Sequence, residues 1–257
     1  VIIFDDSDNP IDLRQDCRYS NLFRMMELKG ILWEVVFGQR IGQVANHQKA
    51  LEMAQTPFVW RVDDDNIVEP NVLQRLMRHT LNDKVGAVAS CVLHPGAKFH
   101  PNSTSGKIED CNFKYAVQFA AFNGVQSVDH LYSTFLYRKS AAKHGYEKGL
   151  SRIGHREETL FTYQIKRAGW DLIVDGNAVT WHFQSPTGGI RDFSDGSMWG
   201  NDQKLFENKM AAWGVNFTKY KFVYLDNGIG DHYAFKHILK DLKAKYHDHK
   251  IIISPCY

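Results

Sequence analysis

The sequence predicts an α/β protein with a mostly parallel central sheet flanked by helices. Short apolar runs typical of strands alternate with segments of helical period, and two of these runs end abruptly in clusters of carboxylates. The 257 residues are 44% hydrophobic, which is enough to bury a sizeable core. Because alternating strands and helices favour parallel pairing, we expect ligands to gather at the carboxyl ends of the strands.

The order of the elements follows from changes of period along the chain. Runs of apolar and β-branched residues predict strands at 1–4, 32–37, 58–62, 85–93, 116–121 and 128–137, a strand pair at 172–175 and 178–183, and strands at 222–225 and 251–253. Helical spacing predicts helices at 13–28, 43–55, 70–81, 140–144, 156–168 and 233–246. The predicted domains are therefore 1–218 and a C-terminal βαβ segment at 219–257, the start of a second domain.

Charge and composition make several classes of protein less favoured. The 31 basic and 29 acidic side chains give a net charge of +2, so nucleic acid is not a default partner. No stretch approaches the roughly 18 apolar residues of a membrane span. The four cysteines are widely separated, which predicts free thiols and a cytoplasmic location. Because the chain opens inside an apolar segment without Met, we expect residues to precede Val1.

The acidic triplet Asp63, Asp64 and Asp65 ends a run that reads as a buried strand. Ionised carboxylates are costly to bury, so the triplet needs a cation, hydrogen-bond donors or open water. Mg²⁺ or Mn²⁺ would suit these hard oxygen ligands. An ordinary strand-to-helix turn explains the same residues, because Asp is common in turns. Asp5 and Asp6 end the first predicted strand, and their place on the same rim favours a binding site.

Other candidate site residues lie in the second half of the chain. Glu157 and Glu158 begin a predicted helix, where acids are favoured by the helix dipole whether or not they have a function. His182 ends a predicted strand, and there a hydrogen-bonded structural role competes with that of a ligand. Residues 184–200, which include Arg191 and Trp199, form a long Gly- and Ser-bearing segment that indicates either a disordered loop or a lid.

Taken together, these motifs resemble family 2 glycosyltransferases with the A-type nucleotide-sugar-binding fold. The resemblance covers about residues 1–189 and rests on six elements in order: Ile2-Ile3-Phe4-Asp5-Asp6-Ser7; Gly42-Gln43-Val44-Ala45-Asn46; Asp63-Asp64-Asp65; Leu136-Tyr137-Arg138-Lys139 with Gly145-Tyr146; Glu157-Glu158-Thr159 with Gly169; and His182. The family often has Arg where Ala45 stands, and its first strand is not among these residues. The segment 226–232 before the last helix is similar to the opening βα unit of B-type, heptosyltransferase-like glycosyltransferases.

The resemblance implies a role for each matched residue. Asp5 and Asp6 would contact the nucleotide base and ribose, Asn46 would lie in the donor site, and Asp63 would approach the ribose. Asp64 would serve mainly to hold the turn. The metal on the donor diphosphate would be bound by Asp65 and His182. Glu158 stands where the family has its Asp base, and Glu157 is the alternative.

The implied function is a metal-dependent inverting glycosyltransferase that moves a sugar from a nucleoside-diphosphate donor, expected to be a UDP-sugar. A carboxylate would take the proton of the acceptor hydroxyl, and Mn²⁺ or Mg²⁺ would neutralise the leaving diphosphate. The acceptor is open: a glycan, another hydroxyl compound or modified DNA. Two alternatives are a sugar nucleotidyltransferase and a non-catalytic glycan- or nucleotide-binding module. Arg191 and Trp199 are lid or acceptor candidates.

Overall fold

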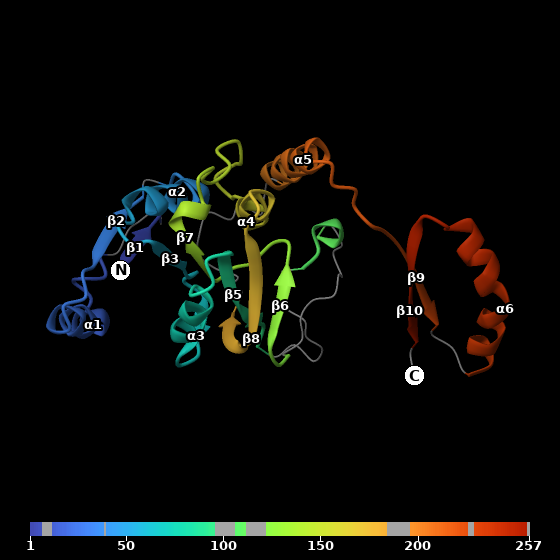
Figure 1. The fold of residues 1–257 in the computed structure, drawn as a ribbon, viewed down its shortest axis with the longest axis horizontal. Helices are drawn as coiled ribbons and strands as arrows, with labels where there is room; N and C mark the ends of the chain where they lie inside the picture. Colours follow the sequence, from blue (N-terminus) through green and yellow to red (C-terminus); the bar gives the residue numbers. More distant parts are fainter. Residues whose placement is uncertain are drawn as a thin grey trace.

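The computed structural model describes residues 1–6, 12–38, 40–95, 106–111, 122–183, 196–225 and 229–255. They form an α/β fold, as predicted, with a central six-stranded sheet, a smaller parallel strand pair at the N-terminal side and a separate C-terminal unit (Figure 1). The predicted strand at 116–121 lies outside the described residues.

The central sheet has the order β3-β7-β5-β8-β4, and β6 also pairs with β8. Its strands are β3 (Phe58–Arg61), β4 (Asn66–Val68), β5 (Val85–Leu93), β6 (Val125–Val128), β7 (Phe135–Arg138) and β8 (Asp171–His182). Only β5 and β8 pair in parallel among these described strands, and the other pairs are antiparallel. The expectation of a mostly parallel central sheet is therefore wrong in this detail. The connection 62–65 is too short for the crossover that a parallel return needs, and β4 after it runs opposite to β3.

β8 is one continuous strand where the sequence predicts two. Its register against β5 shifts between Ser90 and Cys91, which pair with Asp175 and Val179. The turn-forming residues at 175–177 therefore make a bulge rather than a hairpin, and the Asp175 carboxylate accepts a hydrogen bond from the Asn177 amide at 2.9 Å.

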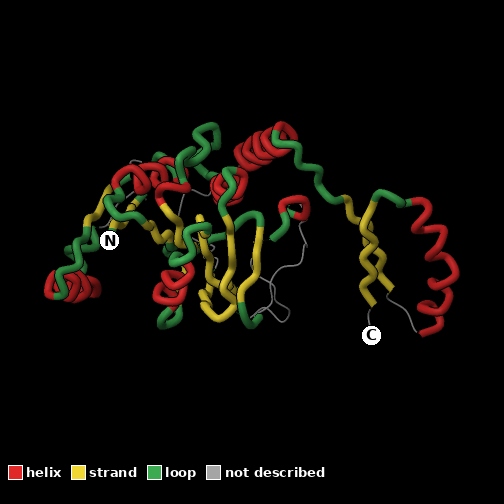
Figure 2. Tube along the Cα trace, viewed as in Figure 1, coloured by secondary structure: helices red, strands yellow, loops and turns green. Residues whose placement is uncertain are grey.

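Helices cover both faces of this sheet (Figure 2). On one face, α3 (Val72–His79) packs Val72 and Leu76 against β5, β7 and β8. On the other, α4 (Glu157–Arg167) and α5 (Ser197–Ala212) pack Phe161 and Phe206 into the larger core cluster. All nine residues of β5 are buried, as expected for a continuous apolar strand enclosed on two sides.

The N-terminal part contains β1 (Ile2–Asp5) and β2 (Glu34–Phe37), which pair in parallel, together with α1 (Cys17–Leu28) and α2 (Gln43–Met53). The Asp16 side chain caps α1 by accepting from the Arg18 amide at 2.9 Å. The predicted helices at 13–28, 43–55, 70–81 and 156–168 are thus all present, each shorter than expected.

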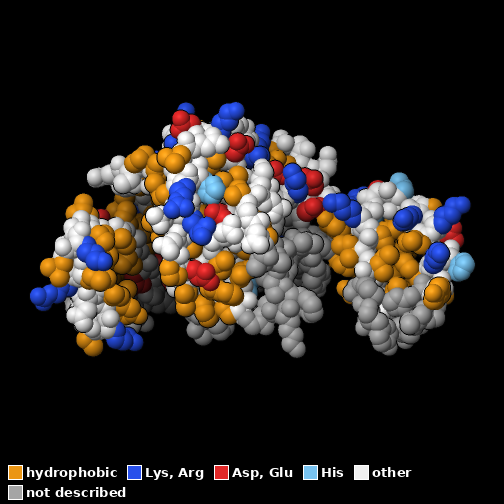
Figure 3. Space-filling view, turned by 60° about the horizontal axis from the view of Figure 1, so that its bottom comes forward, with side chains coloured by type: hydrophobic (Ala, Val, Ile, Leu, Met, Phe, Trp, Pro, Cys, Tyr) orange, Lys and Arg blue, Asp and Glu red, His pale blue; other side chains and the backbone are white. Residues whose placement is uncertain are grey.

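The C-terminal unit consists of β9 (Lys219–Leu225), α6 (Ile229–Lys245) and β10 (His249–Pro255), with the two strands parallel. This is the predicted βαβ segment, and it stands at one end of the molecule (Figure 1). Asp110 connects it to the main body by accepting from the Tyr220 hydroxyl at 2.5 Å. Hydrophobic side chains gather on its surface (Figure 3). Its similarity to a B-type transferase domain stays a prediction.

Three further findings bear on the sequence predictions. The sequence did not predict α5, and its first turn begins inside the expected 184–200 loop. None of the helices in the described ranges has the length and apolar character needed to cross a membrane. Cys17, Cys91 and Cys111 are free thiols, as predicted.

One prediction concerns His130, which lies between β6 and β7 and is 1% exposed. Burial, assisted by the positive charge of Arg156, lowers the pKa of His130 from 6.5 to about 3. Between these values the unfolded chain binds a proton that the native protein does not, so stability falls as the pH falls through this range. The contribution of His130 is up to ~1.4 kcal/mol per pH unit.

We therefore expect His130→Leu to flatten the loss of unfolding free energy between pH 6.5 and 4.5, measured by urea denaturation, relative to the unmodified chain. The control is His144→Leu, because His144 is exposed. Equal slopes in the His130 variant and the unmodified chain would contradict the prediction.

Candidate functional site

The acidic turn lies at the end of β3, and the sheet brings His182 beside it. The chain turns through 62–65 into β4, with the Asn66 amide donating to the Asp63 carbonyl at 3.2 Å. The Phe183 amide donates to the Asp65 carbonyl at 3.0 Å, and Asn66 pairs with His182 in the β4–β8 register. Two segments far apart in sequence are thereby fixed at one edge of the sheet.

Asp63, Asp65 and His182 form a cluster whose potential ligand atoms all lie within 4.8 Å of one another. Asp65 Oδ1 and His182 Nε2 are 3.1 Å apart. The Tyr132 hydroxyl lies 3.1 Å from His182 Nδ1, so the other ring nitrogen is directed toward Asp65. Two carboxylates and an imidazole held by an outer hydrogen bond fit a divalent cation such as Mn²⁺.

Asp63 is held from two sides. The Ser133 hydroxyl donates to Asp63 Oδ2 at 2.9 Å, and Arg61 Nη2 lies 3.2 Å from Asp63 Oδ1. The side-chain amide of Asn66 in turn donates to the Ser133 hydroxyl at 2.9 Å and to the Thr134 hydroxyl. The carboxylate of Asp63 therefore has a fixed orientation, whereas Asp64 between the two cluster residues is exposed.

The two glutamates at the start of α4 have different environments. Glu157 is 0% exposed and forms an ion pair with Arg61, while Glu158 is half-buried. Burial raises the pKa of Glu157 to about 8, and the charge of Arg61 opposes this rise. The charges of Glu158 and Asp63 also act on Glu157, which places the helix start close to the acidic turn. Of the two, only Glu158 is accessible to a substrate.

Asp5, Asp6 and Asn46 belong to the N-terminal part. Asp6 accepts hydrogen bonds from the amides of Ile41 at 3.2 Å and Gly42 at 2.8 Å, so it fixes the entry to α2. Gly42 has φ +95°, and a Cβ there would overlap the backbone of Arg152, so glycine is required. The Asp5 carbonyl accepts from the Gly38 amide at 2.6 Å.

Asn46 is buried in the first turn of α2, and its side-chain oxygen has no hydrogen-bond partner among the described residues. The next residue, His47, lies 3.9 Å from Glu157. The first turn of α2 therefore adjoins the start of α4.

α5 holds the loop that leads into α4. Asp202 is 2% exposed and accepts from the Ser151 amide at 2.6 Å, the Ser151 hydroxyl at 2.8 Å and the His155 amide at 2.9 Å. Trp199 is half-buried in the first turn of α5, and its ring lies 4.9 Å from that of His155. The expectation that Trp199 lies on a loop is therefore wrong, because residues from Ser197 onward are helical. Arg191 lies outside the described residues.

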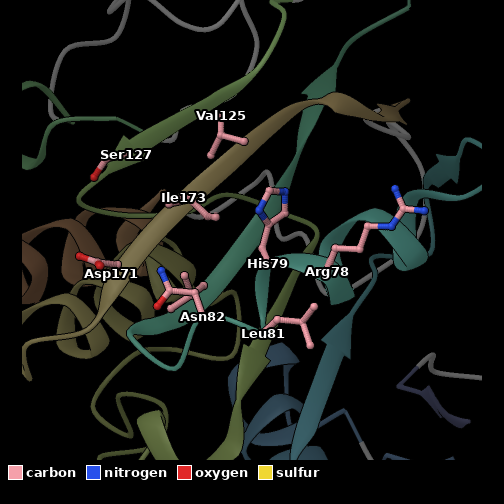
Figure 4. A pocket seen from close by; sticks show the side chains of 9 residues that line it. Arg78, His79, Leu81, Asn82, Val125, Ser127, Asp171 and Ile173 are labelled. Carbon is pink, nitrogen blue, oxygen red and sulfur yellow. The ribbon is translucent and has the colours of Figure 1, made fainter.

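A hollow of about 660 Å³ lies between the end of α3 and strands β6 and β8 (Figure 4). His79 and Asp171 are among its lining residues. It includes none of the candidate site residues, and it adjoins the first residues of β5 and β8, the ends opposite to His182. This hollow is separate from the acidic cluster.

Sequence analysis did not single out Arg61, Ser133, Asp202, His155 or His47. Arg61 had a signal: a cation inside an apolar strand has to find a buried partner. No sequence pattern indicated a role for Asp202, because its hydrogen-bond partners lie some fifty positions away in the chain. The sequence did name Asp63, Asp65 and His182, and the structure brings these three together.

Comparisons with known proteins were made at the level of sequence and of fold. The family model described as glycosyl transferase family 2 matches residues 1–145. No curated protein sequence matches the chain significantly. A crystal structure of GalNAc-T7 with UDP, GalNAc and Mn²⁺ is similar at 13% identity and a TM-score of 0.58, covering 80% of this chain and 41% of that one. S. aureus TarS 1-349 in complex with UDP-GlcNAc is similar at 12% identity and a TM-score of 0.52, covering 81% and 57%. The chain thus spans about half the length of these structures.

The Asp202 contacts make a testable prediction. Asp202→Asn retains one acceptor oxygen for three donors, so we expect it to lower the free energy of unfolding by about 1–3 kcal/mol. Amide hydrogen exchange at 151–156 should accelerate at the same time. Lys204→Gln, at an exposed position on the same helix, is the control and should change stability by less than about 0.5 kcal/mol. Equal effects of the two substitutions in urea denaturation would contradict the role of Asp202.

Proposed function

The chain belongs to glycosyl transferase family 2 and has the A-type glycosyltransferase fold, and from this we propose that it is a metal-dependent inverting glycosyltransferase with a nucleoside-diphosphate sugar donor. The observation that carries the proposal is the cluster of Asp63, Asp65 and His182 beside the start of α4. The GalNAc-T7 and TarS structures compared above contain UDP or a UDP-sugar, which favours a UDP-sugar for this chain.

In this proposal, Asp65 and His182 hold Mn²⁺ or Mg²⁺, and Asp63 contacts the donor ribose or shares the metal. When bound, the metal would neutralise charge on the leaving diphosphate. Asp5, Asp6 and Asn46 contribute to the nucleotide site. Because the Asp6 carboxylate accepts hydrogen bonds from the Ile41 and Gly42 amides, we expect it to shape that site rather than contact the base.

Glu158 acts as the general base. Its carboxylate takes the proton of the acceptor hydroxyl while the acceptor oxygen bonds to the anomeric carbon and the bond from that carbon to the diphosphate breaks. Attack from the face opposite the leaving group inverts the anomeric configuration. Glu157 is the poorer candidate because it is buried and paired with Arg61, which leaves it a structural role.

The acceptor is a hydroxyl compound that reaches Glu158, and a glycan suits the neighbouring aromatic side chains. Trp199 and His155 form a half-buried ring pair, His155 precedes Glu158 by three residues, and aromatic faces stack on sugar rings. A nucleic acid acceptor is an alternative outcome of an acceptor screen. The free thiols at Cys17, Cys91 and Cys111 support a reducing, cytoplasmic compartment.

The first test addresses the base. We expect Glu158→Gln to lower kcat by roughly 100-fold or more, the usual contribution of a general base, and to leave donor affinity unchanged. Released nucleotide measures turnover, and calorimetry with UDP and Mn²⁺ measures binding. Loss of binding together with turnover would contradict a role confined to proton transfer. Release of pyrophosphate from a nucleoside triphosphate would indicate a nucleotidyltransferase, and unchanged function would indicate a binding module.

The second test addresses the metal ligands. Asp65→Asn and His182→Asn should each weaken Mn²⁺ binding in the presence of UDP, and Tyr132→Phe should weaken it less, by roughly 10-fold, because Tyr132 acts only through His182. Electron paramagnetic resonance of free Mn²⁺ gives the affinity. Asp64→Asn is the matched comparison on the same turn and should have the smallest effect. An Asp64 variant as impaired as the Asp65 variant would overturn the assignment.

A further inference from the structure

Arg61 is the side chain that connects the two halves of the candidate site. It ends β3 and is 6% exposed. Its Nη2 lies 3.2 Å from Asp63 Oδ1, and its Nη1 forms the ion pair with Glu157 Oε1. Asp63 belongs to the turn after β3, whereas Glu157 belongs to the first turn of α4. One guanidinium therefore contacts a carboxylate on each of the two elements.

The position of Arg61 is fixed by its surroundings. Arg61 pairs with Phe135 across the β3–β7 ladder, and its guanidinium lies 5.5 Å from the centre of the Phe135 ring. Guanidinium presents its donors in a rigid planar fork, and Arg61 Nε and Nη2 both donate to Asp63 Oδ1, at 3.3 and 3.2 Å, while Nη1 meets Glu157 as an ion pair. Because so little of Arg61 is exposed, its surface is not available to a substrate.

Aromatic rings enclose the Glu157 side of this bridge. Tyr146 stacks on Phe161 with ring centres 4.0 Å apart and on His47 at 5.4 Å. His47 lies 3.9 Å from Glu157. These rings exclude water from the ion pair, and removing water strengthens the attraction between the two charges. The enclosed bridge is therefore a more rigid connection than an exposed ion pair would be.

We propose that Arg61 is a positioning residue that couples the acidic turn Asp63–Asp65 to the start of α4, and so sets the placement of Glu158 relative to the donor. The consequence for the reaction rests on the proposed function, whereas the coupling between turn and helix does not. Arg61 also places one positive charge among the carboxylates of Asp63, Glu157 and Glu158, which would otherwise repel one another.

The coupling is tested by hydrogen exchange without any ligand. Glu157→Gln alters only α4, yet it should accelerate exchange of the Asn66 and Phe183 amides, which are hydrogen-bonded across the acidic turn. The expected acceleration is roughly 10-fold, the size of coupling found within one ion-pair network. Reciprocally, Asp63→Asn should accelerate exchange of the Leu160 amide, which bonds to the Arg156 carbonyl. Acceleration confined to the substituted element would overturn the proposal.

A matched control exists at the other end of the same strand pair. Arg138 pairs with Phe58 across the β3–β7 ladder, its guanidinium lies 4.9 Å from that ring, and it donates to the Thr80 carbonyl at 2.8 Å. Arg138→Lys should leave exchange of Asn66 and Leu160 unchanged, whereas Arg61→Lys should accelerate both. Arg61→Met removes the guanidinium altogether, but it leaves Glu157 buried and unpaired and can prevent folding. The double variant Arg61→Met with Glu157→Met removes both charges and avoids this cost. In it, Asp63→Asn should no longer affect Leu160.

Kinetics separate positioning from a general loss of structure. Arg61→Lys should lower kcat by roughly 10-fold while the donor KM stays within about threefold, because an interaction acting on the placement of the base is expressed in the transition state. Arg138→Lys should retain both constants. An unchanged kcat, or a rise in KM alone, would overturn the positioning role. If the unmodified chain transfers no sugar from any donor, the proposed function fails, and the exchange experiment still decides the coupling.

Discussion

The parallel pairing of β5 and β8 is the constraint on which the rest of the structure depends. β5 is buried along its whole length, and β8 runs beside it from Asp171 to the end of β5. β4 and β6 both pair with β8, so its register determines where the acidic turn and His182 lie. A shift of β8 by one residue would turn its inward side chains to the other face and separate His182 from Asp65. The candidate site is thus a consequence of a register set by burial on both faces of the sheet.

Buried charge is the second constraint, and the sheet accommodates it at one end of β3. Arg61, Glu157 and Asp63 place a cation between two carboxylates in a region with little solvent. Removing these groups from water is costly, so the arrangement persists only because each charge has a partner and the aromatic neighbours hold the geometry. This free-energy cost is offset in function if the ion pairs keep β3 and α4, which are far apart in the sequence, in one relative position. Ordinary apolar packing between β3 and α4 would permit small sliding that a planar guanidinium fork does not.

Much of the fold was predictable from local pattern. The helices at 43–55 and 156–168 have clear helical spacing, and the fully apolar run at 85–93 indicates a strand enclosed on both faces. The mixed direction of the strands in the central sheet was not predictable, because strand direction depends on how the strands are connected. The bulge at 175–177 was mistaken for a hairpin turn because both contain the same turn-forming residues. The helix α5 was missed because Gly196, Ser197 and Gly200 indicate a loop at its start, and its docking through Asp202 and Phe206 is tertiary.

The candidate site shows the same division. Asp63, Asp65 and His182 could be named from the sequence because short motifs of a known family carry them, and the structure brings them within 4.8 Å of one another. The residues that orient them could not, because Tyr132, Ser133 and Arg61 act through contacts that no local pattern encodes. Of these orienting residues, Arg61 is the one that the sequence comes closest to indicating, because an arginine in a buried apolar strand has to be paired with an anion or an acceptor.

Glu157 and Glu158 are adjacent in one short motif but have different surroundings. Adjacent residues at a helix start point in different directions, because successive side chains on a helix are about 100° apart. Glu157 is directed into the core and meets Arg61, while Glu158 keeps contact with solvent. The helix dipole stabilises both carboxylates equally, so it cannot decide between them. What distinguishes them is solvent access: Glu158 is open to a ligand, whereas Glu157 is 0% exposed and meets Arg61 instead.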